Sequence, residues 1–161
     1  MQYIEVKELD QELYDFHCHQ KQYYQLDKDN FSYQSLNEDI VSTPPGFENH
    51  EHHCYKINKD HQLIGYIDYL VGYRYSMQHD SHYIWIGLFL IDEKVQNCGY
   101  GHIIIQHFLD LWKNQYKSVQ LGCMTNNEKG LRFWQSFGFE KIAEAKAGQN
   151  DCIVLELQLT S

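Results

Sequence analysis

The 161-residue sequence lacks several features that define large classes of proteins. No apolar run approaches the roughly 20 residues needed to cross a bilayer, and the first ten residues are too acidic for a secretory signal. Only two prolines and no low-complexity tract are present, and 43% of the residues are hydrophobic, which excludes a mainly disordered chain. We therefore expect a soluble, cytoplasmic protein with a single domain over residues 1–161.

Basic residues are also scarce. Thirteen Lys and Arg stand against 22 Asp and Glu, a net charge of −9, so a surface that follows nucleic-acid phosphates has little positive charge to build on. We expect neither a nucleic-acid nor a membrane partner. The first half of the chain holds 14 of the acids and only 6 of the bases. Such a field attracts amines or polyamines, although an acidic surface that only keeps the protein soluble explains the charge equally well.

Paired metal-binding or disulfide motifs are missing as well. The five cysteines form no CxxC pair, which favours free thiols in a reducing compartment. Among ten histidines, His50 and His52 would share one face of a strand with Cys54. No second spaced pair completes a tetrahedral site. We therefore expect surface histidines and no bound metal.

The hydrophobic pattern predicts an α+β fold with a mixed sheet. The nearly unbroken apolar run from Tyr83 to Ile91 is typical of a central strand covered on both faces. A polar segment, 76–81, is expected to be a loop. The expected strands cover 1–9, 53–59, 63–75, 82–91, 118–123, 140–145 and 152–159, and the expected helices cover 11–27, 32–41, 103–114 and 127–137.

The central strand is followed by the segment QNCGYG, from Gln96 to Gly101, and then by a helix. A strand, a glycine loop and a helix in this order aim backbone N–H groups and the positive helix end at one point, which favours a phosphate. The glycine spacing fits neither the Walker loop nor the dinucleotide GxGxxG motif. Another cofactor that carries phosphate is therefore expected.

These residues resemble the GNAT superfamily of N-acetyltransferases, whose pyrophosphate loop reads [QR]-x-x-G-x-[GA]. The family's second motif, Asn-x-x-[AG]-x-x-x-aromatic-x-x-x-Gly-Phe, is matched by Asn127, Gly130, Trp134, Gly138 and Phe139. Both motifs occur in the family order within residues 82–139. The resemblance implies the GNAT acyltransferase fold, with a mostly antiparallel sheet of about six to seven strands and about four helices.

The resemblance also implies acetyl-CoA as cosubstrate. The backbone of residues 89–91 should pair with the pantetheine arm like an added strand, and an N–H near Leu90 should donate to the thioester oxygen. The amides of 97–102 should hold the pyrophosphate, and the Asn127 side chain should bond the cofactor arm. The full set of expected cofactor contacts is Phe89, Leu90, Ile91, Gln96, Asn97, Cys98, Gly99, Tyr100, Gly101, His102, Asn127, Gly130, Phe133 and Trp134.

The proton-handling positions differ from those of the family. Where relatives carry a base or an acid, this chain has Trp85, Gly87, Gly122 and Trp134. Three explanations stay open: a neutral amine attacks and its proton passes through water, a base comes from the first half of the chain, or the domain binds acetyl-CoA without catalysis. The base candidates are Asp68, Tyr66, Tyr73, His82 and Tyr83, and the expected catalytic set is Leu90, Trp134, Asp68 and Tyr83.

The function expected from these features is acetyl transfer to a primary amine by direct attack in a ternary complex. A covalent acetyl-enzyme is disfavoured because no cysteine occupies a nucleophile position in the family and Cys98 lies in the phosphate loop. Residues 11–41, 44–47 and 76–81 should wall the acceptor side, and their acids and aromatic rings suggest a small cationic amine. A non-catalytic acetyl-CoA sensor is the alternative, and a homodimer is left open.

Overall fold

In the computed structural model, which describes residues 1–48 and 51–159, a seven-stranded sheet runs in the order β1-β2-β3-β4-β5-β7-β6. All neighbouring strands are antiparallel except β4 and β5. The strands are β1 (Gln2–Glu5), β2 (His52–Lys59), β3 (Gln62–Arg74), β4 (Gln78–Ile91), β5 (Ser118–Met124), β6 (Glu140–Ala147) and β7 (Asn150–Gln158). The helices are α1 (Gln11–His19), α2 (Lys21–Leu26), α3 (Tyr33–Val41), α4 (Tyr100–Trp112) and α5 (Glu128–Gln135).

The expected α+β fold and mixed sheet are confirmed, with five of these helices instead of about four. The single helix expected over 11–27 is wrong, because the chain leaves helical geometry at Gln20, where φ is −87° and ψ is 64°. The Gln20 side chain is 2% exposed. Its amide donates to the Phe16 carbonyl, and its oxygen accepts the N–H of Glu93. These bonds fix the break between α1 and α2 and tie it to the segment that follows β4.

The loop expected over 76–81 is also wrong. β4 already begins at Gln78, which pairs with Arg74 across a tight turn. Ser76 and Met77 both have positive φ values, 74° and 57°, so the chain reverses within these residues and the polar stretch after them continues as strand. A polar sequence can form an exposed strand end when a long partner strand supplies the hydrogen bonds.

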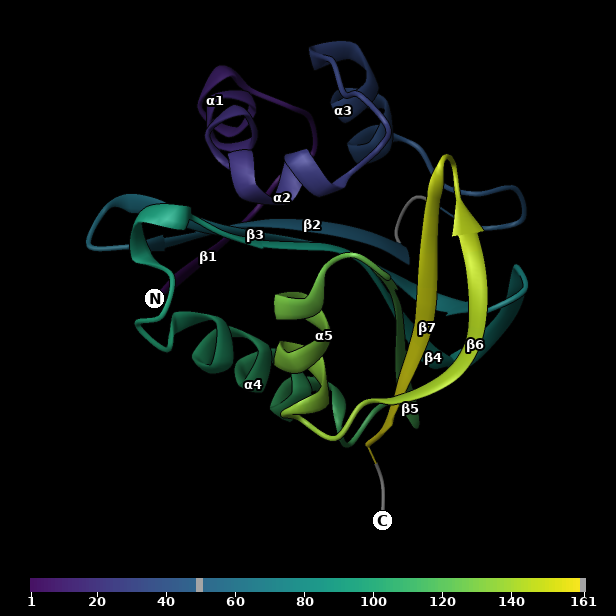
Figure 1. Ribbon diagram of the computed structural model, residues 1–161. Coiled ribbons are helices and arrows are strands. Elements are labelled where there is room, and N and C mark those ends of the chain that lie inside the picture. Colours follow the sequence, from purple (N-terminus) through teal and green to yellow (C-terminus); the bar gives the residue numbers. More distant parts are fainter. Residues whose placement is uncertain (49–50, 160–161) are drawn as a thin grey trace.

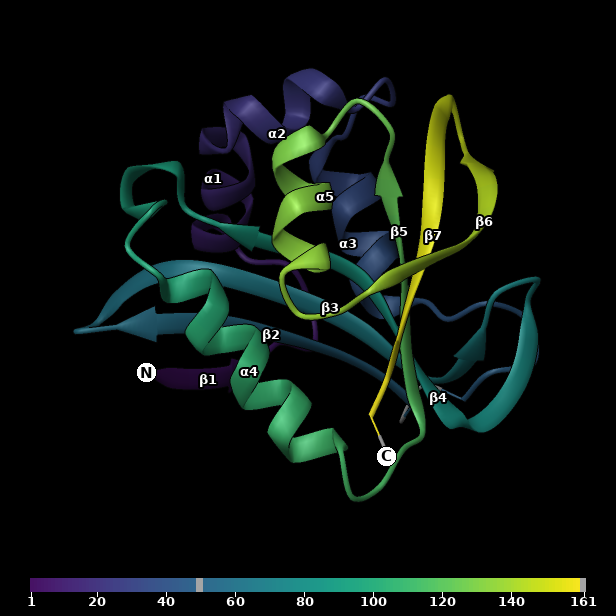
Figure 2. The same cartoon turned by 60° about the horizontal axis from the view of Figure 1, so that its bottom comes forward.

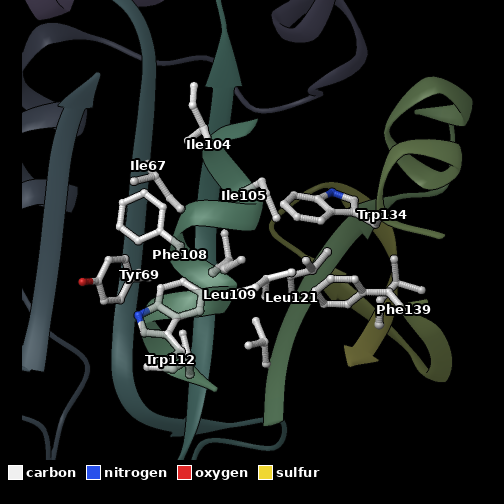
Figure 3. Packing of buried hydrophobic residues seen from close by; sticks show 14 of the residues in the cluster. Ile67, Tyr69, Ile104, Ile105, Phe108, Leu109, Trp112, Leu121, Trp134 and Phe139 are labelled. Carbon is white, nitrogen blue, oxygen red and sulfur yellow. The ribbon is translucent and has the colours of Figure 1, made fainter. Parts of the chain in front are cut away.

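The helices cover the two faces of the sheet unequally (Figure 1). α1 and α3 pack on one face of β2, β3 and β4 through a small core that includes Leu13, Phe16 and Ile40. α4 and α5 cover the other face over a larger core, in which Ile105 and Leu121 lie beside Trp134 (Figure 3). In the described part of the chain, no helix is long and apolar enough to span a membrane.

The central strands β4 and β5 pair for only four residues, from Tyr83 opposite Ser118 to Ile86 opposite Leu121. Beyond this point both strands continue without each other, as the different directions of their ends in Figure 2 show. The register of β3 with β4 also shifts here, so that Gly87 has no pairing partner on β3. The divergence and the bulge together leave part of the β4 backbone without strand partners on the β5 side.

Candidate active site

A cleft of about 370 Å³ follows the diverging end of β4, between β5, α5 and the start of α4. Thirteen of the fourteen expected cofactor residues line this cleft. The exception is Cys98, which is exposed and outside the lining residues, although its backbone belongs to the loop. The structure therefore brings the residues of both sequence motifs to one place.

The glycine loop closes one end of this cleft. Gly99 caps α4 with a left-handed backbone, φ +83°, and offers no side chain to the first turn. The N–H groups of the first helical turn have no partner within the helix, so they remain available to an anion. A β-carbon on Gly101 would stand 3.1 Å from the Phe133 ring. Glycine at 101 thus keeps α4 close to α5 beside the loop.

The backbone of β4 narrows one expectation. Asp92 donates its N–H to the Ile64 carbonyl at 2.8 Å, and in an antiparallel ladder such bonded pairs recur every second residue. The N–H of Leu90 is therefore directed at its register partner on β3, so the donor expected near Leu90 has to be a neighbouring N–H of β4. The N–H groups of Phe89 and Ile91 face the other way, toward the cleft.

Two polar side chains connect the loop to its surroundings. Gln96 donates to the Ile91 carbonyl at 3.2 Å and accepts from the ammonium of Lys129 at 2.7 Å. This places a cation from α5 beside the glycine loop. Lys129 was missed at the sequence level because the loop motif names only positions within the loop, and a surface lysine 33 residues later carries no signal of its own.

On the α5 side, the Asn127 side-chain oxygen Oδ1 caps the helix by accepting the N–H of Gly130 at 3.0 Å. A β-carbon on Gly130 would stand 2.5 Å from the Asn127 side-chain nitrogen, so the second motif needs a small residue there. Among the described residues that nitrogen has no hydrogen-bond partner, and it lies at the cleft. Trp134, 7% exposed, forms an apolar wall and contacts Phe89 at 6.0 Å between ring centroids.

A second cleft of about 640 Å³ lies on the other side of β4, under α1, α2 and α3. Among the described residues, no Lys or Arg lines it, whereas four aspartates do, with five aromatic rings of Tyr, Phe and Trp. Three residues line both clefts: Tyr23, Gly87 and Leu88. The two clefts therefore meet at the β4 bulge. The four aspartates are Asp27, Asp29, Asp39 and Asp68.

The electrostatics of this second cleft favour a cation. Partial burial and the nearby Asp68 raise the pKa of the Asp39 carboxyl above its usual range. Asp68 itself lies beside His52, with 2.8 Å between Asp68 Oδ1 and His52 Nε2, and this hydrogen bond raises the pKa of the imidazole. The Asp39 and Asp68 carboxylates repel each other, and a bound positive charge stabilises their charged forms.

The expected base candidates divide into two groups. Asp68 and Tyr66 line the second cleft. Tyr73, His82 and Tyr83 line neither cleft, and Tyr83 instead lies under the Arg74 guanidinium, 4.9 Å from the ring centroid. The structure thus does not bring Tyr83 to the site. Residues 76–81, expected to wall the acceptor side, line neither cleft, because they form the hairpin between β3 and β4.

One aromatic residue was missed as a site residue. Tyr23, on α2, lines both clefts, and burial raises the pKa of its phenol. Tyr23 follows no motif, and its pairing with Tyr24 suggested only helical packing. Its position depends on the break at Gln20, where the Gln20 side chain and the Gln22 N–H both bond Glu93, just after β4.

A splayed central strand, a glycine loop at a helix start and an adjoining acidic cleft are the features of an acetyl-CoA-dependent acetyltransferase. The sequence profile of the acetyltransferase (GNAT) family matches residues 6–139, and the chain belongs to this family.

Known proteins agree with this assignment. The chain is 30% identical over 114 residues to a spermine/spermidine N(1)-acetyltransferase of Bacillus subtilis, which covers 66% of this chain and 74% of that protein. An acetyltransferase structure from Thermus thermophilus superposes with a TM-score of 0.72, 16% identity and coverage of 98% and 97%. A GNAT acetyltransferase of Elizabethkingia anophelis with acetyl-CoA bound matches with a TM-score of 0.53, 19% identity and coverage of 68% and 77%.

Proposed function

We propose that this acetyltransferase moves the acetyl group of acetyl-CoA to a primary amine of a small cationic acceptor of the polyamine class. The observation that carries the proposal is the meeting of the two clefts at Gly87. One cleft has the features of a cofactor site, and the other is acidic and aromatic. An amine held in the acidic cleft therefore meets the first cleft at this bulge.

The residues of the first cleft fit acetyl-CoA. The free amides at the start of α4 and the Lys129 ammonium suit the pyrophosphate, and the outward N–H groups of Phe89 and Ile91 suit the pantetheine amides. When bound, acetyl-CoA supplies the thioester. We assign to the Phe89 N–H the donation to its oxygen that was expected of Leu90, a contribution of about 3–4 kcal/mol in comparable sites.

The second cleft suits an acceptor with more than one positive charge. Its aspartates lie on α3, on β3 and on the segment after α2, so separate ammonium groups find separate carboxylates. Aromatic faces such as Tyr24 and Trp85 add cation–π attraction. The Bacillus subtilis relative is named for spermine and spermidine, which supports the same class of acceptor here.

Chemistry in a ternary complex requires few further groups. The neutral amine nitrogen bonds to the acetyl carbon, the carbon–sulfur bond breaks, and the sulfur leaves as a thiolate. The proton lost by the amine passes to water or to Asp68, and the thiolate is protonated from water. Positioning of the amine beside the thioester accounts for most of the rate.

The test is release of free CoA thiol with a panel of spermidine, spermine, a peptide amino terminus and an aminoglycoside. We expect turnover with the polyamines above the others. Asp39→Asn should raise KM for the polyamine by about five- to tenfold, because one carboxylate of the acceptor cleft is lost, and acetyl-CoA affinity should stay unchanged. Preference for the peptide would contradict the acceptor class. Binding of acetyl-CoA without any turnover would favour the sensor instead.

A further inference from the structure

Three potential metal ligands converge beside the acceptor cleft, outside the cofactor cleft. His52 and Cys54 alternate on β2, so their side chains share one face, and Asp68 is the register partner of Cys54 on β3. Their ligand atoms all lie within 4.8 Å of one another. Cys54 Sγ is 3.6 Å from His52 Nε2 and 3.5 Å from Asp68 Oδ2, and Nε2 is 2.8 Å from Asp68 Oδ1.

This cluster is not arranged as a nucleophilic triad. In a triad the histidine contacts the nucleophile with one ring nitrogen and the carboxylate with the other. Here the same nitrogen, Nε2, faces both the sulfur and the carboxylate. Cys54 is also 2% exposed, so an acyl donor has no access to its sulfur. A nitrogen, a sulfur and an oxygen atom within 4.8 Å of one another instead form a possible set of metal ligands.

The distances fit a tetrahedral ion. With Zn–S near 2.3 Å and Zn–N and Zn–O near 2.1 Å, neighbouring ligand atoms stand about 3.4–3.6 Å apart. The two distances from Cys54 already have these values. If the ion takes Asp68 Oδ2, the oxygen 3.5 Å from Cys54 Sγ, the hydrogen bond of 2.8 Å between His52 Nε2 and the other oxygen, Oδ1, must open. Rotation of the Asp68 carboxylate, on a side chain that is 17% exposed, opens this hydrogen bond.

The surroundings supply the remaining features of a metal site. The backbone of Ser42 contributes to the raised pKa of the His52 imidazole, and a backbone group beside a ligating histidine can hold its ring in orientation. His52 and Asp68 line the acceptor cleft, whereas Cys54 lies behind them. A fourth ligand position would therefore open into the cleft.

We propose that His52, Cys54 and Asp68 form a binding site for a divalent ion of the zinc class, with a fourth position open to the acceptor cleft. The thiolate selects zinc over magnesium or calcium. On binding, the Cys54 thiol releases its proton and sulfur bonds the metal. The ion also takes the Asp68 carboxylate and adds positive charge to the cleft, so it should compete with a cationic acceptor. This last consequence rests on the proposed function, whereas metal binding itself does not.

The test uses Co²⁺ as a spectroscopic probe on the full-length protein, after treatment with a chelator and without acetyl-CoA or amine. We expect one equivalent of Co²⁺ to give a thiolate-to-cobalt charge-transfer band and the strong visible bands of tetrahedral cobalt, and one equivalent of Zn²⁺ to abolish both. Cys54→Ser should lose the charge-transfer band and weaken Zn²⁺ binding by about 100-fold or more. Cys18→Ser, which removes a thiol on α1 far from the cluster in sequence and outside it in space, should keep both.

Two results would overturn the proposal: absence of the charge-transfer band in the wild-type protein, or a band that Cys18→Ser removes and Cys54→Ser retains. His52→Gln provides a second ligand variant with less change in the core, and it should weaken Zn²⁺ binding even if Cys54→Ser fails to fold. Because these measurements use neither cosubstrate nor acceptor, failure of the proposed acetyl transfer would leave their outcome unchanged. The competition is then measured separately, as a rise in polyamine KM with Zn²⁺ that Cys54→Ser removes.

Discussion

Asp68 on β3 lies against Gly87 on β4, so that a β-carbon at position 87 would stand 3.2 Å from the Asp68 Oδ1 atom. Gly87 occupies the bulge where the two clefts meet. The missing side chain at 87, which removes a base expected by comparison with relatives, therefore also makes room for a carboxylate from the neighbouring strand. A side chain at position 87 and the Asp68 carboxylate in its present place would occupy the same space.

Gly87→Ala should impair transfer more than binding of the cofactor. The added methyl group forces the Asp68 carboxylate to move by a few tenths of an ångström and narrows the passage between the clefts. We expect kcat/KM for the amine to fall by about 10- to 100-fold, since small misplacements are costly in a positioning mechanism. Steady-state kinetics with calorimetric measurement of acetyl-CoA affinity checks this. Wild-type kinetics would show that the bulge is not the crossing point.

Acetyl-CoA should raise the melting temperature, because a ligand that binds only the folded state stabilises it, by about 2.7 kcal/mol at 100 times Kd. Gly101→Val should abolish this rise. Its side chain meets Phe133 and fills the space through which a pyrophosphate reaches the amides of the first helical turn. Thermal denaturation with and without cofactor separates this effect from any loss of intrinsic stability. An unchanged rise in the variant would refute the loop assignment.

Trp134 should matter through its bulk. Its ring packs between Phe89, Phe133 and Phe139, so Trp134→Ala should cost about 3–5 kcal/mol of stability and lose both affinity and rate. Trp134→Phe should keep most activity. Trp134→Tyr tests whether a tyrosine here donates a proton to the leaving thiolate. We expect at most a modest change in kcat. Urea denaturation of each variant measures the change in stability. A large gain in turnover for Trp134→Tyr with unchanged binding would contradict our proposal that water protonates the thiolate.

His17 should make stability depend on pH. It is 1% exposed, its Nδ1 atom is 2.7 Å from the Tyr24 hydroxyl, and burial lowers its pKa to about 4. Between pH 6.5 and about 4 the unfolded chain binds a proton at this residue and the folded protein does not, so stability is lost as the pH falls through this window. The loss should reach roughly 3 kcal/mol at its lower end.

The matched variant is His17→Gln, which keeps a polar partner for Tyr24 but cannot titrate. Urea denaturation of both proteins between pH 7 and 4 measures the difference, in which other titrating groups cancel. The stability of the wild-type protein should fall more steeply than that of the variant. Parallel curves would show that His17 binds its proton equally in the folded and unfolded states, so that burial does not lower its pKa.

The features that the amino-acid sequence predicted correctly are local ones. The glycine loop from 96 to 101 depends on backbone conformations and on contacts a few residues apart, so spacing along the chain reveals it. The central strand β4 could also be predicted, because a strand that is buried on both faces consists mostly of apolar residues. These local patterns were sufficient to select thirteen residues that line one cleft.

The remaining features depend on which segments meet in space. The break at Gln20 is fixed by the N–H of Glu93, 73 residues away, and Tyr23, which lines both clefts, follows this break. The direction of the Leu90 N–H follows from the pairing of β3 with β4, and a shift of one residue would reverse it. His52 and Cys54 lacked further ligands in their own segment, and strand register supplied Asp68 from 14 residues beyond Cys54. A residue's neighbours across a sheet are set by hydrogen-bond register and long-range packing, which leave no trace in the spacing along the chain.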